Sequence, residues 1–143
     1  MLIKTSTLTG SQLDWAVAKC EGADFHHVGN VLCVLWTEKF DVRLTDYNPS
    51  TNWAQGGPIL EREFIATLSV ETNPCERRWA ANPNRVTQTT FDDGGYPMDF
   101  GGYPMLSVYE SRCHYGPTPL IAAMRCRVSS KLGNEVAIPE ELI

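Results

Sequence analysis

Two apolar stripes at helical spacing, one near each end of the chain, place the strongest constraint on the fold. The first stripe consists of Leu13, Ala16, Val17 and Cys20. Thr9 and Gln12 have the spacing of a capping box, in which each side chain binds a free backbone N–H of the first turn. Gly22 is placed to end the helix in a left-handed conformation. The pattern therefore predicts a helix over residues 9–21 with one buried face.

The second stripe lies close to the other end of the chain. It consists of Leu120, Met124 and Val128, with Ile121 and Leu132 beside them. Thr118 can cap this helix, and Pro119 suits its first turn because the N–H at that position has no helical partner. Gly133 can end it. We therefore expect a second helix over residues 118–132.

Between the two helices, the sequence changes to patterns that are typical of strands. Residues 31–36 are a continuous apolar run, which favours a buried central strand. Residues 65–70 alternate between apolar and polar, as a half-buried strand does, and shorter candidates lie at 2–5 and 78–80. Two helices and several short strands predict an α+β domain, in which a small antiparallel or mixed sheet is packed by the two main helices.

The length of 143 residues fits a single domain, residues 1–143. Residues 82–117 form a loop-rich insertion, in which Gly-Gly-Tyr-Pro-Met occurs at 94–98 and again at 101–105. We expect a local duplication in a loop or hairpin, followed by a returning strand over residues 106–109. The aromatic and methionine side chains of the repeat suit adaptable contacts with another protein. Equally, the repeat can fold back over the sheet.

Charge and cysteine content exclude several classes of protein. The formal net charge is −5, so the basic surface of a protein that binds duplex nucleic acid is missing. No apolar run approaches the roughly 18 residues of a membrane helix. The five cysteines are an odd number without a Cys-x-x-Cys pair, which disfavours a disulfide framework or a zinc ribbon and indicates a reducing cytoplasm. Cys20 and Cys126 fall in the predicted helices, where a free cysteine is usually a small buried apolar group.

The polar, turn-rich segment 46–63 contains the candidate ligand site. Tyr47 and Trp53 offer two aromatic faces on which a base could stack, each stack being worth about 1–3 kcal/mol in proteins that bind single strands. The side-chain amides are those of Asn48, Asn52 and Gln55, which offer paired donors and acceptors for a base edge or a ribose.

The second half of this segment suggests a place for a phosphate. Gly56, Gly57 and the following Pro58 predict the start of a short helix, whose free backbone amides could hold an anion. Arg62 could add a charge-assisted contact, and Arg125 on the last helix could reach the same phosphate.

The same residues also have a purely structural interpretation. Trp53 would then be an anchor of the core, the asparagines would make turns, and the diglycine would only start a helix. The two interpretations differ most clearly for Trp53, which is exposed beside a cavity in the first and buried in the second.

Other groups offer weaker chemistry. Glu61 and Glu63 are two residues apart and do not share a helical face. His26–His27 has no cysteine or carboxylate at ligand spacing beside it. Cys113–His114 are neighbours in sequence, which rarely form a catalytic dyad. We therefore expect no metal, no cofactor and no catalytic residue.

Three blocks of the sequence carry a resemblance to a known family. They are Leu8-Thr9-Gly10 with Leu13-Asp14-Trp15-Ala16-Val17-Ala18-Lys19-Cys20-Glu21-Gly22, Asn52-Trp53-Ala54-Gln55-Gly56-Gly57-Pro58-Ile59-Leu60-Glu61-Arg62-Glu63, and Thr118-Pro119-Leu120-Ile121-Ala122-Ala123-Met124-Arg125 with Ser130-Lys131-Leu132-Gly133. In this order they resemble the small phage and prophage proteins labelled NinX-like. The resemblance implies a phage origin, expression in the host cytoplasm and no established activity. The chain departs from the family's usual form around the Gly-Gly-Tyr-Pro-Met repeat.

Together these observations lead to one functional hypothesis and two alternatives. We expect a phage accessory protein, not an enzyme, that binds and sequesters a small nucleotide-like ligand without turnover, as a counter-measure to host immune signalling. The site could be shared between subunits of a homo-oligomer. The first alternative is a protein-interaction module that inhibits a host protein through the Tyr-Pro-Met loop. The second is a small hydrolase that uses Glu61 or Glu63.

Overall fold

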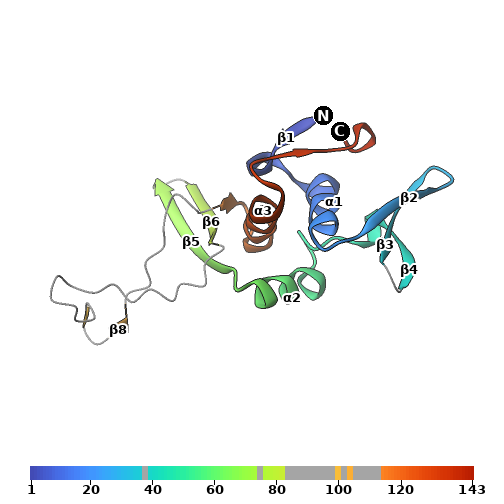
Figure 1. Ribbon diagram of the computed structural model, residues 1–143. Coiled ribbons are helices and arrows are strands. Elements are labelled where there is room, and N and C mark those ends of the chain that lie inside the picture. Colours follow the sequence, from blue (N-terminus) through green and yellow to red (C-terminus); the bar gives the residue numbers. More distant parts are fainter. Residues whose placement is uncertain (37–38, 74–75, 83–98, 101–102, 105–113) are drawn as a thin grey trace.

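The computed structural model describes most of the chain (Figure 1). The described residues are 1–36, 39–73, 76–82, 99–100, 103–104 and 114–143. Over these residues the helices are α1 (Gly10–Cys20), α2 (Trp53–Glu63) and α3 (Pro119–Leu132). Figure 1 shows α1 and α3 side by side, with α2 packed across them and short sheets around the helices. The predicted α+β class is confirmed.

The central helix is α3, which contacts both other helices and the strands beside them. Its buried residues are Leu120, Ala122, Ala123, Met124, Arg125, Cys126 and Val128. The helix begins as predicted, because the Thr118 hydroxyl accepts the Ile121 N–H at 3.2 Å and Pro119 occupies the first turn. Gly133 follows the last turn with a φ of 92°. The predicted helix over residues 118–132 is confirmed.

The first predicted helix is also confirmed, but its capping box is wrong. The predicted stripe of α1 is fully buried, and Gly22 has the expected positive φ of 84°. The Thr9 side chain makes no capping hydrogen bond. The Gln12 amide instead donates to the Leu142 carbonyl at 2.9 Å. The C-terminal segment packs against the first turn of α1 and offers an acceptor that the sequence pattern could not show.

Small antiparallel sheets surround the helices in place of the one sheet that the sequence predicted. One sheet has the order β2 (Asp24–Val28), β3 (Val31–Trp36), β4 (Lys39–Arg43). A second has the order β5 (Ala66–Asn73), β6 (Glu76–Asn82), β9 (His114–Gly116). Two-stranded sheets pair β1 (Leu2–Lys4) with β10 (Glu135–Ala137) and β7 (Asp99–Phe100) with β8 (Tyr103–Pro104). The second copy of the Tyr-Pro repeat thus falls in β8. The first copy and the predicted strand over residues 106–109 lie outside the described residues.

The apolar run at residues 31–36 forms a central strand, as predicted, but most of it is not buried. Only Cys33 and Val34 are buried within β3. The sheet covers the core with one face, where Phe25 stacks on Trp15 at a ring distance of 5.0 Å. Val31 and Leu35 of the same strand are exposed.

The cysteines on the helices behave as the sequence predicts. Cys20 and Cys126 are buried, and so is Cys33 in β3. Burial raises the pKa of the Cys20 thiol to about 11, so this thiol is protonated and unreactive at neutral pH. None of the described helices combines the length and the apolar character that crossing a bilayer would require.

The prediction that α2 starts at the diglycine is wrong. The helix starts three residues earlier, because the Asn52 side chain accepts the Ala54 N–H at 2.9 Å and caps the first turn. Gly56 and Gly57 therefore lie inside the helix, and the Gly56 N–H already donates to the Asn52 carbonyl at 2.8 Å. Pro58, placed beyond the first turn, removes one hydrogen bond of this helix.

Gly56 and Gly57 differ in how closely other atoms approach them. A Cβ on Gly56 would lie 2.3 Å from the Pro49 carbonyl oxygen and 2.7 Å from the Leu120 side chain. A Cβ on Gly57 would meet only the Trp53 ring, at 3.9 Å. The close approach at Gly56 is what lets α2 pack on both the preceding loop and α3.

We expect Gly56→Ala to lower the free energy of unfolding by about 2 kcal/mol or more, since the clash is with backbone. Gly57→Ala should raise it by about 0.5–1 kcal/mol, because alanine favours a helix more than glycine does. Urea unfolding of both variants measures the difference. Equal effects of the two substitutions on the free energy of unfolding would contradict the close packing at Gly56.

Candidate functional site

A buried carboxylate holds the predicted ligand loop in place. Asp14 on α1 is only 5% exposed, and its Oδ1 accepts the Ser50 N–H at 2.9 Å. Pro49 and Ser50 are buried against the helix. Burial raises the pKa of Asp14, and the hydrogen bonds from Ser50 counteract this effect. The middle of the loop is therefore part of the core, and only its flanks can meet a ligand.

The amides of the loop mostly stabilise the loop itself. Gln55 Nε2 donates to the Asp46 carbonyl at 2.9 Å, and Gln55 Oε1 accepts the Asn48 N–H at 2.6 Å. Asn52 Oδ1 caps α2. By contrast, the side chain of Asn48 is half-buried and has no hydrogen-bond partner among the described residues. Of the three predicted amides, Asn48 is thus the one whose donors and acceptor are all open to a ligand.

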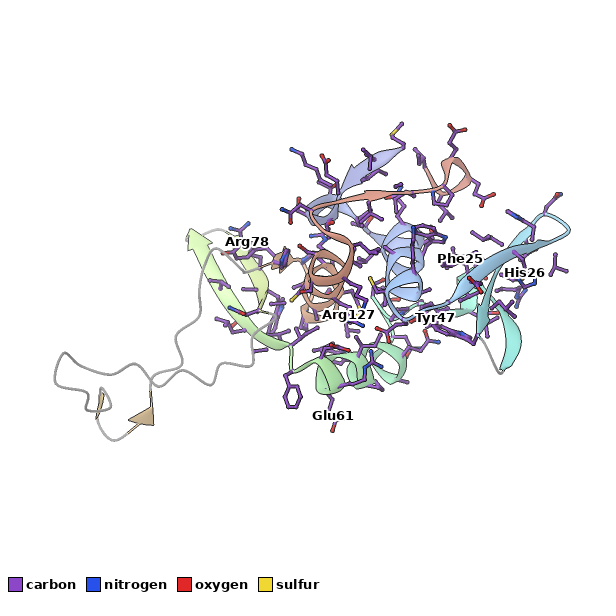
Figure 2. The ribbon with its side chains drawn as sticks, viewed as in Figure 1. Phe25, His26, Tyr47, Glu61, Arg78 and Arg127 are labelled. Carbon is purple, nitrogen blue, oxygen red and sulfur yellow. The ribbon has the colours of Figure 1, made fainter. Side chains whose placement is uncertain are left out.

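The two aromatic residues of the loop have different environments. Tyr47 is half-buried, and its ring meets Trp36 edge-on at a centroid distance of 5.4 Å (Figure 2). Burial is the main cause that raises the pKa of Tyr47. Trp53, the first residue of α2, is 55% exposed. The structural interpretation, in which Trp53 anchors the core, is therefore wrong for Trp53.

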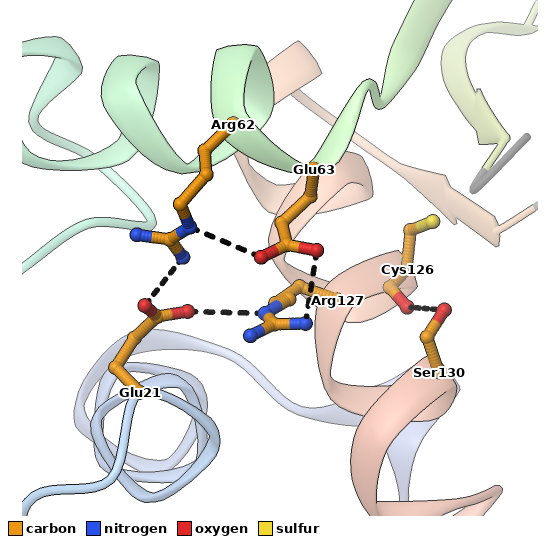
Figure 3. A network of polar contacts seen from close by, with 6 residues as sticks. All are labelled: Glu21, Arg62, Glu63, Cys126, Arg127 and Ser130. Atoms are coloured by element: carbon orange, nitrogen blue, oxygen red, sulfur yellow. Dashed lines mark hydrogen bonds and ion pairs between the residues drawn. The ribbon is translucent and has the colours of Figure 1, made fainter. Parts of the chain in front are cut away.

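Arg62 does not join Trp53. The two residues are nine positions apart on α2, which places them on opposite faces of the helix and about 14 Å apart along its axis. Arg62 faces the other helices, where it pairs with Glu21 and, at 3.0 Å, with Glu63 (Figure 3). Glu61 points away from the helices into solvent (Figure 2).

Arg125 is buried and joins separate segments of the fold. It is 8% exposed, and its guanidinium donates to the Leu8 carbonyl at 3.0 Å and the Tyr115 carbonyl at 2.8 Å. Both contacts are to backbone oxygens of distant segments. The structure therefore brings neither predicted arginine to the aromatic loop.

A closed ring of four charges joins the three helices, and sequence reasoning missed it (Figure 3). Arg127 Nε lies 3.0 Å from Glu21 Oε1, and Arg127 Nη1 lies 3.3 Å from Glu63 Oε2. Arg62 closes the ring on the other side, between the same two carboxylates. The hydrogen bond from Arg62 is the main cause that lowers the pKa of Glu63. Since Glu21 and Arg127 are 106 residues apart, no local pattern indicates their pairing.

The carboxylates of α2 do not form an acid–base pair. Glu61 is exposed, whereas Glu63 is bound by two arginines. Within the described part of the chain, no three His, Cys, Asp or Glu side chains gather as a metal site would require. Away from the aromatic loop, a cavity of about 400 Å³ lies beside the N-terminal strand.

We expect Arg127→Met to lower the free energy of unfolding by about 1–3 kcal/mol at pH 7, because two carboxylates lose a shared cation while the apolar stem is kept. The folded-state pKa of Glu63 lies below its ordinary value of 4.5. The charge of Glu63 therefore stabilises the fold above that value and ceases to do so as the pH falls through the lowered pKa. The difference between variant and wild type should shrink over this range in urea titrations.

Arg43→Met is the matched control, because Arg43 pairs with Asp46 on the surface with both side chains more than half exposed. We expect this change to cost less than about 0.5 kcal/mol. An Arg127→Met effect as small as that of Arg43→Met would show that the ring of charges does not stabilise the fold.

One comparison with known proteins identifies the family. The family model described as "Bacteriophage P22, NinX" matches residues 4–97, which include α1, the aromatic loop and α2. The chain belongs to this phage NinX family. No curated protein sequence matches it significantly.

Proposed function

We propose that this member of the phage NinX family acts by binding, without catalysis, and that its ligand is nucleotide-like and stacks on Trp53. One observation carries the proposal, namely that the indole of Trp53 is 55% exposed at the start of a helix whose preceding loop is fixed. A large exposed aromatic side chain on a rigid element is a stacking surface for any nucleobase.

Preorganisation of the loop supports this proposal. Asp14 holds the Ser50 amide, and Gln55 binds backbone groups at Asp46 and Asn48. Because these contacts order the loop before a ligand arrives, binding does not have to supply the entropy of ordering it. Stacking on Trp53 can then contribute its full value, about 1–3 kcal/mol per base.

The surroundings of Trp53 favour recognition of a base over recognition of a phosphate. The N–H groups of Ala54, Gln55 and Gly56 are already bonded to Asn52. Arg62 lies on the opposite face of α2, and the chain has a formal net charge of −5. The side chain of Asn48 and Nδ2 of Asn52 remain to bind a base edge. We therefore expect an affinity that depends only weakly on salt.

In this proposal the protein works in the host cytoplasm by sequestering its ligand. The surroundings of the two carboxylates support binding without conversion. Glu61 is exposed, whereas Glu63 pairs with Arg62 and Arg127, so the two are not placed to act together as an acid–base pair. If the ligand is a host immune signal, one protein site removes one signal molecule. Such a mechanism requires tight binding and an abundant protein.

Another observation favours a second candidate function, which is the binding of a host protein or of a second copy of the chain. Exposed apolar side chains continue beyond Trp53, with Phe64 58% exposed at the end of α2 and Leu68 40% exposed on β5. Aromatic residues of this kind are typical of the centre of a protein interface. The Tyr-Pro-Met repeat, which the sequence suggested for such contacts, lies mostly outside the described residues.

Trp53→Ala tests the lead proposal. Purified protein is titrated calorimetrically with a panel of cyclic and ADP-ribose-type nucleotides, then heated, and the released material is analysed. We expect at least one nucleotide to bind, to be recovered intact, and to bind about tenfold or more weakly to the variant, because one stacked base is lost. The fold should be retained, since the ring is mostly exposed.

Phe64→Ala is the matched control, because it removes an equally exposed aromatic ring from the other end of the same helix. It should leave nucleotide binding unchanged. Recovery of a converted nucleotide would indicate an enzyme. Equal weakening by both variants, or no binding to any nucleotide, would contradict the stacking role of Trp53, and in the second case analytical ultracentrifugation and a host-protein pull-down would test the interaction surface.

A further inference from the structure

A cavity of about 400 Å³ lies where three separate segments of the chain meet, away from the aromatic loop. Its walls are Lys4 at the end of β1, Thr5 and Ser6 directly after it, His114 at the start of β9, Asn134 after α3, and Glu135 at the start of β10. This volume lies in the lower part of the range of about 300–1,000 Å³ that is usual for small-molecule sites. The cavity is therefore large enough for a small metabolite.

The charged side chains of the cavity are opposite in sign and stand side by side. Lys4 and Glu135 are directly opposite each other in the antiparallel β1–β10 pair, so both lie on one face of the ladder. Both side chains are exposed where they line the cavity, and neither has an ionic partner among the described residues. A ligand that carries a single sign of charge would be attracted by one of these groups and repelled by the other.

The third polar group is His114. Its imidazole is half-buried and has no hydrogen-bond partner among the described residues. Burial lowers the pKa of His114 below its ordinary value of 6.5, so the ring is neutral at pH 7. A neutral imidazole offers one donor and one acceptor without adding charge. It can therefore bind a polar ligand while leaving the balance of Lys4 and Glu135 unchanged.

The adjacent hydroxyl and backbone groups are held rigidly. Thr5 is buried, its hydroxyl donates to the Gly133 carbonyl at 2.7 Å, and its N–H donates to the Asn134 carbonyl at 2.8 Å. These bonds join β1 to the turn after α3. The backbone positions of Lys4 and Glu135 are thus held relative to each other before any ligand binds.

We propose that this cavity binds a free α-amino acid, with its carboxylate on Lys4, its ammonium on Glu135 and its side chain toward His114. A zwitterion is the ligand whose two charges can pair with both exposed side chains at once, and the short separation of its charged groups suits two side chains that are neighbours across a ladder. The site is independent of Trp53, on α2, and of the function proposed for it.

The chain itself provides a spectroscopic probe. It contains three histidines, so the imidazole signals in a proton–carbon NMR spectrum can be assigned with a His114→Gln variant. The full-length protein is titrated with each of the twenty amino acids in turn. We expect at least one of them to shift the signal of His114 and to leave those of His26 and His27 in place.

Blocked derivatives and variants separate the two charged contacts. The N-acetyl form and the amide form of the best amino acid each lack one charge, and each should bind about tenfold or more weakly. Lys4→Gln should weaken binding of the free amino acid to a similar degree but leave binding of its amide form unchanged. Glu135→Gln should do the same for the N-acetyl form.

Two controls make the outcome decisive. Arg43→Gln changes the net charge as Lys4→Gln does but lies on β4, outside the cavity, and should bind the amino acid normally. Trp53→Ala should also bind it normally, which separates this site from the nucleotide site. The proposal is overturned if no amino acid moves the His114 signal, if the blocked derivatives bind as well as the free form, or if inorganic phosphate competes as effectively.

Discussion

The buried guanidinium of Arg125 is the contact on which the arrangement of the core depends. It lies on α3 and donates to the carbonyl of Leu8, just before α1, and to the carbonyl of Tyr115 in β9. Since Ser6 and His114 stand close to these two carbonyls in sequence, the same side chain also fixes two walls of the cavity beside β1. A residue that the sequence suggested for a phosphate thus serves to hold three segments together.

The position of Trp53 depends on a second set of polar contacts. Asp14 holds the loop before α2, the ring of Glu21, Arg62, Glu63 and Arg127 holds the other end of the helix, and the bare backbone of Gly56 allows close packing between them. Apolar burial along α2 is limited, since Gly56 and Ile59 are its only buried residues. Geometry at this helix is therefore set mainly by directional contacts, which explains why its outer surface can remain aromatic and exposed.

Local patterns in the sequence predicted those parts of the fold that local interactions decide. The helices α1 and α3 follow from their apolar stripes. The strands β3 and β5 form at the predicted apolar and alternating runs, but most of β3 is not buried, and Ala66 and Leu68 of β5 are exposed. The predicted start of α2 is wrong because the Asn52 side chain, a favoured N-cap, caps the helix before the diglycine is reached. The capping box predicted at Thr9 does not form, and the Gln12 side chain donates to an acceptor 130 residues away instead. For the candidate site, the sequence identified the residue types. The separation of Arg62 and Arg125 from Trp53 follows from tertiary contacts alone. The same is true of the cavity that Lys4 and His114 line together.

The pairing of β1 with β10 has a consequence for how the protein is made. The amino group of Met1 bonds to the Ile138 carbonyl at 3.0 Å, and Leu2 stands opposite Ala137 in the ladder. During synthesis, β1 thus has no strand to pair with until β10 has also been made. Contacts of such long sequence separation form slowly. We therefore expect the β1–β10 sheet to be among the last parts of the described fold to form, because its two strands are so far apart in the sequence.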